Sequence, residues 1–363
     1  MRISPILGFF LLTAAYFIAP FANNGEACTR VLYESGKDSF ITGRTMDWFE
    51  DTQTDLWAFP RGMKRDGGAG EGSVKWVSKY GSVAASFYGV ATVDGMNETG
   101  LVGNHLYLSE ADYGTEAHAG KPALSVGALI QFMLDNYATV DEAVAAWRSD
   151  PYKIVAPVLP NGKAAAGHVA LSDASGDSAI FEWIGGKLVI HHGREFTVMT
   201  NSPPYDKQLT LSSYWEEIGG TNMLPGTSRA ADRFVRASFY LKASPKFDDP
   251  RIAVSSVFSI IRAVSVPIGI GDPARPNIAT TSWRTVADQA AKRYFFDSAI
   301  SPDVFWVDIG KLNLSEGAPS LRLDLRDHPI LAGEVSASFK PAEPFQWLSY
   351  GKLAAKDRPK NHE

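Results

Sequence analysis

Residues 28–48 read CTRVLYESGKDSFITGRTMDW, a pattern that is typical of a β-hairpin. Two segments rich in β-forming side chains, 29–33 and 39–47, flank a run of turn-forming residues. The pattern therefore predicts that Cys28 begins a strand, and that this strand pairs with the one that carries Arg44.

The residues before Cys28 have the layout of an export signal. Arg2 provides a basic start, residues 5–22 are almost wholly apolar, and a short polar stretch ends in the small residue Ala27. This layout is typical of a secretory signal peptide that is cleaved after Ala27. An uncleaved membrane anchor is the alternative, but two prolines interrupt an apolar stretch that falls short of the ~20 residues a membrane span needs. We therefore expect residues 1–27 to be removed, leaving no stable membrane span.

The composition is that of an ordinary globular protein, because 45% of the 363 residues are hydrophobic and 21% are charged. The 35 basic and 40 acidic residues give a net charge of −5, which argues against a nucleic-acid partner. The single cysteine, Cys28, excludes a disulfide framework and a thiolate metal cluster, and the 7 histidines show no metal-ligand spacing. We therefore expect neither a metal ion nor another cofactor.

The chain beyond the hairpin shows runs of strands, then helices, then strands. Residues 168–172, 178–183 and 187–192 alternate apolar and polar side chains between short turns, which predicts an antiparallel meander. Further predicted elements are a turn at 94–100, helices at 123–137, 139–148, 228–241 and 251–263, and strands at 74–78, 83–88, 101–108, 196–200, 282–287, 293–297 and 304–309. This order predicts an α+β fold of antiparallel sheets with helices outside, and the absence of a linker-like stretch predicts one domain over residues 28–363.

Cleavage after Ala27 would make Cys28 the new N-terminus, and three roles are open to it. It could carry the lipid of a lipoprotein, although such signals usually have an apolar residue three positions earlier, where this chain has Gly25. It could be an N-terminal nucleophile, whose own α-amino group, with a reference pKa of roughly 7.7–8.0, serves as general base for the thiol. It could also be an ordinary small buried residue.

Five short motifs occur in one order along the chain. They are Cys28-Thr29-Arg30, Gly43-Arg44-Thr45-Met46-Asp47-Trp48, Asp94-Gly95-Met96-Asn97-Glu98-Thr99-Gly100-Leu101, Thr200-Asn201-Ser202-Pro203, and Leu224-Pro225-Gly226 followed by Arg233-Phe234. This ordered set, which extends from Cys28 to about Ile309, resembles the choloylglycine hydrolase family of penicillin V acylases and conjugated bile salt hydrolases. The resemblance implies the four-layer αββα fold of the N-terminal nucleophile hydrolases, with two stacked antiparallel sheets between layers of helices. It also favours the nucleophile role for Cys28.

The resemblance further implies roles for the residues around Cys28. The Cys28 thiolate would attack an amide carbonyl and form an acyl-enzyme, and the guanidinium of Arg44 would favour the thiolate. Asp47 would accept a hydrogen bond from the α-amino group and orient it. A surface ion pair for Arg44 and a turn cap for Asp47 are the structural alternatives.

Other site residues would stabilise charge or bind the acyl group. Asn201 would donate an N–H to the oxyanion, where losing one such donor costs about 2.7–4 kcal/mol of barrier. Tyr107 falls at the second oxyanion position, with Asn104 as the alternative if the alignment shifts by a few residues. Arg233 would support charge in the transition state, and Trp48 is the best candidate for the wall of an apolar acyl pocket. Each of these side chains could instead serve only the turn, helix surface or core in which it lies.

The sequence therefore predicts an exported cysteine amidohydrolase that cleaves linear, non-peptide amides with an apolar or aromatic acyl group. Penicillin V, conjugated bile salts and N-acyl homoserine lactones are the candidate substrates that the resemblance offers. Tyr107 and the bacterial type of export signal favour a penicillin V acylase-like enzyme of the periplasm. The alternatives are a conjugated bile salt hydrolase and a lipid-anchored binding lipoprotein without catalysis. The resemblance also suggests a homotetramer.

Overall fold

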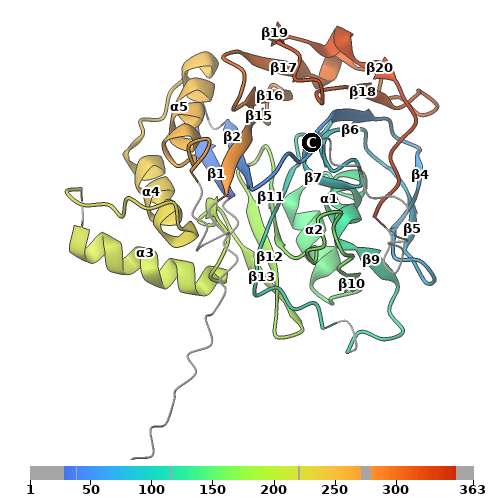
Figure 1. Cartoon of the computed structure of the whole chain (residues 1–363), viewed down its shortest axis with the longest axis horizontal. Coiled ribbons are helices and arrows are strands. Elements are labelled where there is room, and N and C mark those ends of the chain that lie inside the picture. Colours follow the sequence, from blue (N-terminus) through green and yellow to red (C-terminus); the bar gives the residue numbers. More distant parts are fainter. Residues whose placement is uncertain (1–27, 38, 115–116, 220, 271–278, 349–363) are drawn as a thin grey trace, which may run out of the picture.

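Two large β-sheets lie face to face between layers of helices in the computed structural model of the chain (Figure 1). The structure describes residues 28–37, 39–114, 117–219, 221–270 and 279–348, so the predicted signal peptide lies outside the described residues. Within these ranges, no helix is both long and apolar enough to cross a membrane. The arrangement agrees with the predicted four layers.

The first sheet contains seven strands in the order β14-β1-β2-β15-β16-β17-β19. They span Val198–Met199 (β14), Thr29–Glu34 (β1), Phe40–Trp48 (β2), Thr280–Asp288 (β15), Arg293–Ser298 (β16), Val304–Asp308 (β17) and Gly333–Glu334 (β19). Neighbouring strands are antiparallel except for β17 and β19, which pair in parallel over two residues.

The second sheet contains nine antiparallel strands in the order β13-β12-β11-β8-β7-β6-β3-β18-β20. They span Lys187–His192 (β13), Ser178–Ile184 (β12), His168–Ser172 (β11), Val102–Leu106 (β8), Ala91–Asn97 (β7), Ser82–Phe87 (β6), Leu56–Phe59 (β3), Leu321–Leu323 (β18) and Lys340–Pro341 (β20). Two small sheets pair Lys64–Asp66 (β4) with Lys75–Val77 (β5), and Ala123–Ser125 (β9) with Lys153–Val155 (β10).

Helices cover the outer face of each sheet (Figure 1). Helices α1 (Val126–Asn136) and α2 (Val140–Trp147) pack on the second sheet, while α4 (Ala230–Ala243) and α5 (Pro250–Ala263) pack on the first. Helix α3 (Tyr205–Gly219) lies against α4. Two short 3-10 helices, Ile309–Lys311 and Ser336–Ser338, lie between the last strands.

Most predicted elements are present with shifted ends. The hairpin pairs Thr29 with Thr45 and Arg30 with Arg44, as the opening stretch of sequence predicts. Thr139 caps α2, because its hydroxyl accepts the backbone N–H of Glu142 at 3.3 Å. The predicted helix 123–137 begins only at Val126, because residues 123–125 form β9.

The predicted turn at 94–100 is wrong over its first half. Residues Asp94 to Asn97 belong to β7, and the chain turns only at Glu98–Gly100. The Asn97 side-chain oxygen accepts the N–H groups of Thr99 and Leu101 and so stabilises that turn. The acidic residue Asp94 lies inside β7 because its carboxylate faces the guanidinium of Arg44 on the other sheet. A local sequence pattern does not reveal such a long-range contact.

On each sheet, one glycine lets a helix pack close to a strand, and the charged residue next to that glycine faces the other sheet. Gly43 and Arg44 are adjacent on β2, so they face opposite sides of the sheet. A Cβ atom at Gly43 would lie 2.6 Å from a Val257 methyl carbon of α5, whereas Arg44 faces the second sheet and pairs with Asp94. Gly95 repeats this arrangement on β7, facing α1 beside the inward-facing Asp94.

Replacing Gly95 with alanine should destabilise the fold. The added Cβ would lie 2.6 Å from the Val83 carbonyl oxygen and 2.9 Å from a Leu134 methyl carbon, so a strand or α1 must shift. Overpacking of this kind costs about 1–3 kcal/mol in the free energy of unfolding. Gly226→Ala is the matched control, because its Cβ would have no neighbour within 4 Å. Urea unfolding of both variants measures the difference, and equal stabilities would contradict this packing.

Candidate active site

Cys28 directly precedes β1 and has only 2% of its surface exposed. Its sulfur accepts the backbone N–H of Asp47 at 3.5 Å and lies 3.9 Å from Nη2 of Arg44. The thiol also lies 3.8 Å from the Asp47 carbonyl oxygen, to which a protonated sulfur donates. The β1–β2 pairing therefore brings both predicted neighbours to the sulfur.

Arg44 is held from several sides. Its Nη1 lies 3.6 Å from Oδ2 of Asp94, its Nη2 donates to the His105 carbonyl oxygen at 3.1 Å, and its guanidinium carbon lies 4.6 Å from the centre of the Trp283 ring. Arg44 and Asp94 are both about 1% exposed, so the ion pair of Arg44 is buried and is not the surface pair considered as the structural alternative. Asp94 is a site-supporting residue that sequence reasoning missed.

Burial dominates the protonation of the cysteine. It raises the pKa of the Cys28 thiol, and the positive charge of Arg44 opposes the shift without cancelling it. The negative charge of Asp47 adds to the increase. In the full-length chain the thiol is therefore protonated at neutral pH, and a base must remove its proton before it can act as a nucleophile.

The Asp47 carboxylate is buried among hydroxyl groups and one cation. It accepts hydrogen bonds from Thr281 at 2.5 Å and Thr45 at 3.2 Å, and Nη1 of Arg233 lies 3.9 Å away. Burial raises the pKa of Asp47 to about 6, although Arg233 and the two hydroxyls oppose the increase.

Arg233 and Asn201 meet at the backbone of Cys28. Arg233 Nη1 donates to the Cys28 carbonyl oxygen at 2.7 Å, and its Nη2 donates to Oδ1 of Asn201 at 3.0 Å. The same Oδ1 accepts the Cys28 N–H at 2.5 Å, while Asn201 Nδ2 donates to the Tyr107 carbonyl oxygen at 2.7 Å. In the full-length chain the Cys28 nitrogen is a peptide nitrogen, and its single hydrogen goes to Asn201 and not to the predicted acceptor, Asp47.

An apolar cavity of about 50 Å³ lies beside the thiol. It is lined by Cys28, Arg44, Met46, Trp48, Phe87, Ala91, Thr92, Val93, His105, Tyr107, Val126, Gly127, Pro157, Leu159, Ala165, Ala166 and Leu348. Trp48 lies in its wall, with edge-to-face contacts to Phe87 at 5.1 Å and Tyr107 at 6.2 Å. Tyr107 thus lines the same cavity as the thiol, whereas Asn104 is not among the lining residues and its Nδ2 donates to Asp94 at 2.7 Å.

A buried polar network supports the turn that carries Asn201. His168 Nδ1 lies 2.7 Å from Oε1 of Glu182, and its Nε2 lies 2.7 Å from the Thr200 carbonyl oxygen. Burial opposes the ionisation of Glu182, but the hydrogen bond from His168 and the nearby His191 ring, whose Nε2 lies 3.7 Å from Oε2, lower the pKa of this carboxyl to about 2. Both ring nitrogens of His168 therefore face hydrogen-bond acceptors, so the ring joins the Glu182 carboxylate to the backbone before Asn201.

Sequence reasoning missed His168 and Glu182 as supports of the site. The available signal was a charged residue in the middle of a strand, β12, whose other residues are mostly apolar. Among the described residues, no three His, Cys, Asp or Glu side chains are grouped to hold a metal ion.

The raised pKa of Asp47 predicts a pH-dependent stability. Because the folded carboxyl binds its proton more tightly than an unfolded aspartate, its contribution is complete below pH 3.8 and is lost as the pH rises through about 6. A shift of this size corresponds to about 3 kcal/mol. The free energy of unfolding of the wild type, relative to Asp47→Asn, should therefore fall by about this amount between pH 4 and pH 7. Urea unfolding across that range measures it, and a constant difference would contradict the buried-carboxyl interpretation.

Comparison with known proteins places this arrangement in a family. The sequence model described as "Linear amide C-N hydrolases, choloylglycine hydrolase family" matches residues 28–329. A penicillin V acylase from Pectobacterium atrosepticum is 50% identical over 345 aligned residues, covering 88% of this chain and 92% of that protein. The structure of a penicillin V acylase from Agrobacterium tumefaciens is 52% identical with a TM-score of 0.82, covering 89% of this chain and 100% of the other.

A more distant structure shares only the fold. A variant of the conjugated bile acid hydrolase from Clostridium perfringens has a TM-score of 0.70 at 20% identity, covering 90% of this chain and 100% of the other. The family match and the two relatives at about half identity are consistent with each other. The chain belongs to the choloylglycine hydrolase family and is a hydrolase of C–N bonds in linear amides.

Proposed function

We propose that the chain is exported to the periplasm, that cleavage after Ala27 exposes Cys28, and that Cys28 is the nucleophile of a penicillin V acylase-like amidase. One observation carries the proposal: the chain's single cysteine lies beside a buried guanidinium and also lines an apolar cavity. A lipid anchor has no need of either neighbour. An acyl-enzyme needs both, one to favour the thiolate and one to bind the acyl group.

In the proposed reaction, the new α-amino group of Cys28 takes the thiol proton, and the thiolate attacks the amide carbonyl carbon. A second Nδ2 hydrogen of Asn201 bonds the oxyanion, with Tyr107 as the second contributor. The C–N bond then breaks, and the leaving amine takes the proton from the α-amino group. Water next attacks the thioester, with the α-amino group as base, and releases the carboxylic acid.

Two features favour penicillin V and N-acyl homoserine lactones as substrates over conjugated bile salts. The two relatives at 50% and 52% identity are both named penicillin V acylases. The cavity wall also contains the aromatic rings of Trp48, Phe87 and Tyr107, which suit a phenoxyacetyl or a slim fatty acyl group.

Replacing the nucleophile should abolish turnover without unfolding the protein. Cys28→Ala should lower kcat/KM for penicillin V by on the order of 10³-fold or more. Lys37→Ala, on the exposed hairpin turn, is the control and should keep full activity. Released amine is measured with penicillin V, an N-acyl homoserine lactone and glycocholate in parallel. Full activity in Cys28→Ala would refute the mechanism, and turnover of glycocholate alone would refute the substrate assignment.

The N-terminus of the exported protein tests the processing step. We expect the mature chain to begin with unmodified Cys28, because the proposed base is the α-amino group that cleavage creates. N-terminal sequencing and intact mass measurement of protein from the periplasmic fraction check this. A start at another residue, or an added lipid mass of several hundred daltons on Cys28, would remove that base and contradict the proposal.

A further inference from the structure

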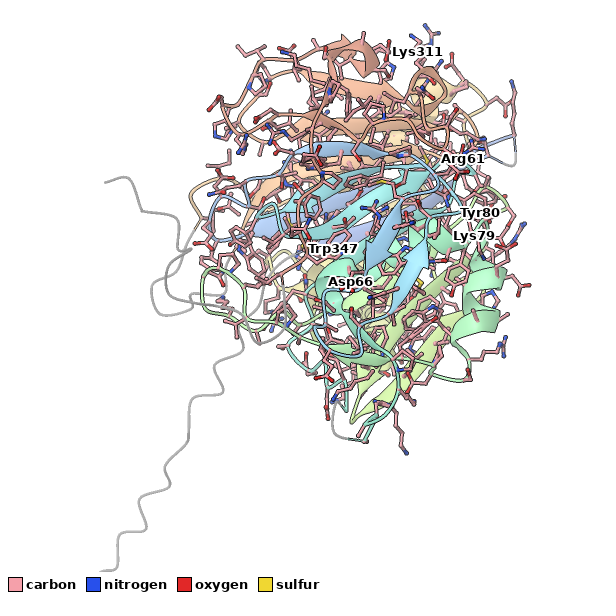
Figure 2. All side chains as sticks on the ribbon, turned by 90° about the vertical axis from the view of Figure 1, so that its right-hand side faces the viewer. Arg61, Asp66, Lys79, Tyr80, Lys311 and Trp347 are labelled. Carbon is pink, nitrogen blue, oxygen red and sulfur yellow. The ribbon has the colours of Figure 1, made fainter. Side chains whose placement is uncertain are left out.

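The last described residues of the chain run across the second sheet toward the cavity. We call residues 342–348 the C-terminal strap. Its Phe345 ring packs at 5.4 Å on Trp57 and at 6.1 Å on Phe59, both in β3. The guanidinium carbon of Arg65 lies 5.8 Å from the centre of the Trp347 ring. Figure 2 shows Trp347 near Asp66, the last residue of β4.

The end of the strap is fixed at two points beside the cavity. The Leu348 N–H donates to the Val90 carbonyl oxygen at 2.9 Å, and the Ser125 hydroxyl lies 3.5 Å from the Leu348 carbonyl oxygen. Val90 and Ser125 directly precede Ala91 and Val126, which line the cavity. These contacts hold the Leu348 side chain in the same cavity wall.

The cavity lining comes from several parts of the fold. Cys28 directly precedes β1, and Arg44 and Trp48 belong to β2 of the first sheet. Ala91 belongs to β7 of the second sheet, and Leu348 belongs to the strap. An acyl group joined to the Cys28 sulfur would therefore share this cavity with the Leu348 side chain.

Leu348 also differs from the other lining residues in its place along the sequence. All the others fall within residues 28–329, the part of the chain that the family model matches. Leu348 lies beyond that match and is partly buried against the core. Leu348 is therefore the part of the cavity lining that comes from outside the residues that the family model matches.

We propose that Leu348 is a specificity-determining residue that limits the length of the acyl group bound beside Cys28. The cavity of about 50 Å³ is small compared with the roughly 300–1,000 Å³ of most ligand pockets, so its walls decide which acyl groups enter. A leucine side chain in the lining of so small a cavity occupies space that a longer acyl chain needs. The inference rests on the proposed function, because it takes Cys28 as the point of acyl attachment.

The test uses penicillin-nucleus amides with acyl groups from butanoyl to dodecanoyl, so that only the chain length varies. Leu348→Ala should move the optimum to longer chains, with at least a tenfold rise in the ratio of kcat/KM for dodecanoyl to that for butanoyl. Leu348→Trp should move the optimum to shorter chains. Ile330→Ala, whose side chain is 77% exposed away from the cavity lining, should leave the profile unchanged. Thermal unfolding confirms that each variant is folded.

A second measurement separates this inference from the proposed function. The binding of free butanoic to dodecanoic acids is followed by tryptophan fluorescence in the wild type and in Leu348→Ala. If the wild type hydrolyses none of the amides, the proposed function fails, while a length preference in acid binding that shifts in Leu348→Ala still supports the inference. If both variants keep the wild-type preference in hydrolysis, and Leu348→Ala also keeps it in acid binding, the inference is wrong.

Discussion

The antiparallel pairing of β1 with β2 is the constraint on which the site depends. Its register places Thr29 opposite Thr45 and Arg30 opposite Arg44, so that Cys28 ends beside the backbone of Asp47. Side chains alternate along a strand, so a slip of one residue would turn Arg44 toward the helix layer. The close fit of Gly43 under α5 opposes such a slip, because no larger side chain fits there.

Buried charges join the layers at the site. Arg44 of the first sheet pairs with Asp94 of the second, and Arg233 of α4 approaches Asp47 of β2. Removing one partner from a buried pair typically costs about 3–5 kcal/mol, because it leaves an uncompensated charge. Each cation therefore requires an acid from a distant segment of the chain. The site is thus fixed in place by the packing of all these elements at once.

Elements that contacts between neighbouring residues stabilise can be predicted from the sequence, whereas elements that depend on contacts between distant segments cannot. The β1–β2 hairpin and the capped start of α2 are predictable, because their signals lie within a few neighbouring residues. The strand character of Asp94 is not, because the reason for a buried carboxylate there is a guanidinium fifty residues earlier, on the other sheet. Helix α3 also escapes prediction, since its buried residues include Gln208 and Ser212 and do not form an apolar stripe.

The site residues also divide into those that the sequence identifies and those that only the structure reveals. The family resemblance identifies Cys28, Arg44, Asp47, Asn201 and Arg233, and the structure brings these five together. The supports His168, Glu182 and Leu348 lie outside the motifs of the resemblance, and no sequence spacing reveals their contacts. His168 of β11 and Glu182 of β12 hold the backbone before Asn201, and Leu348 reaches the cavity from the end of the described chain.

The full-length chain already contains the assembled site, and this bears on how processing would act in the proposed mechanism. Arg233 and Asn201 hold the Cys28 backbone through its carbonyl oxygen and its N–H, and neither contact requires a free N-terminus. Cleavage after Ala27 would convert one peptide nitrogen into an amine and leave these contacts possible. A peptide nitrogen has no basic lone pair, whereas an amine can take the proton that burial keeps on the thiol. The proposed activation is therefore a change in the chemistry of one atom and needs no rearrangement of the fold.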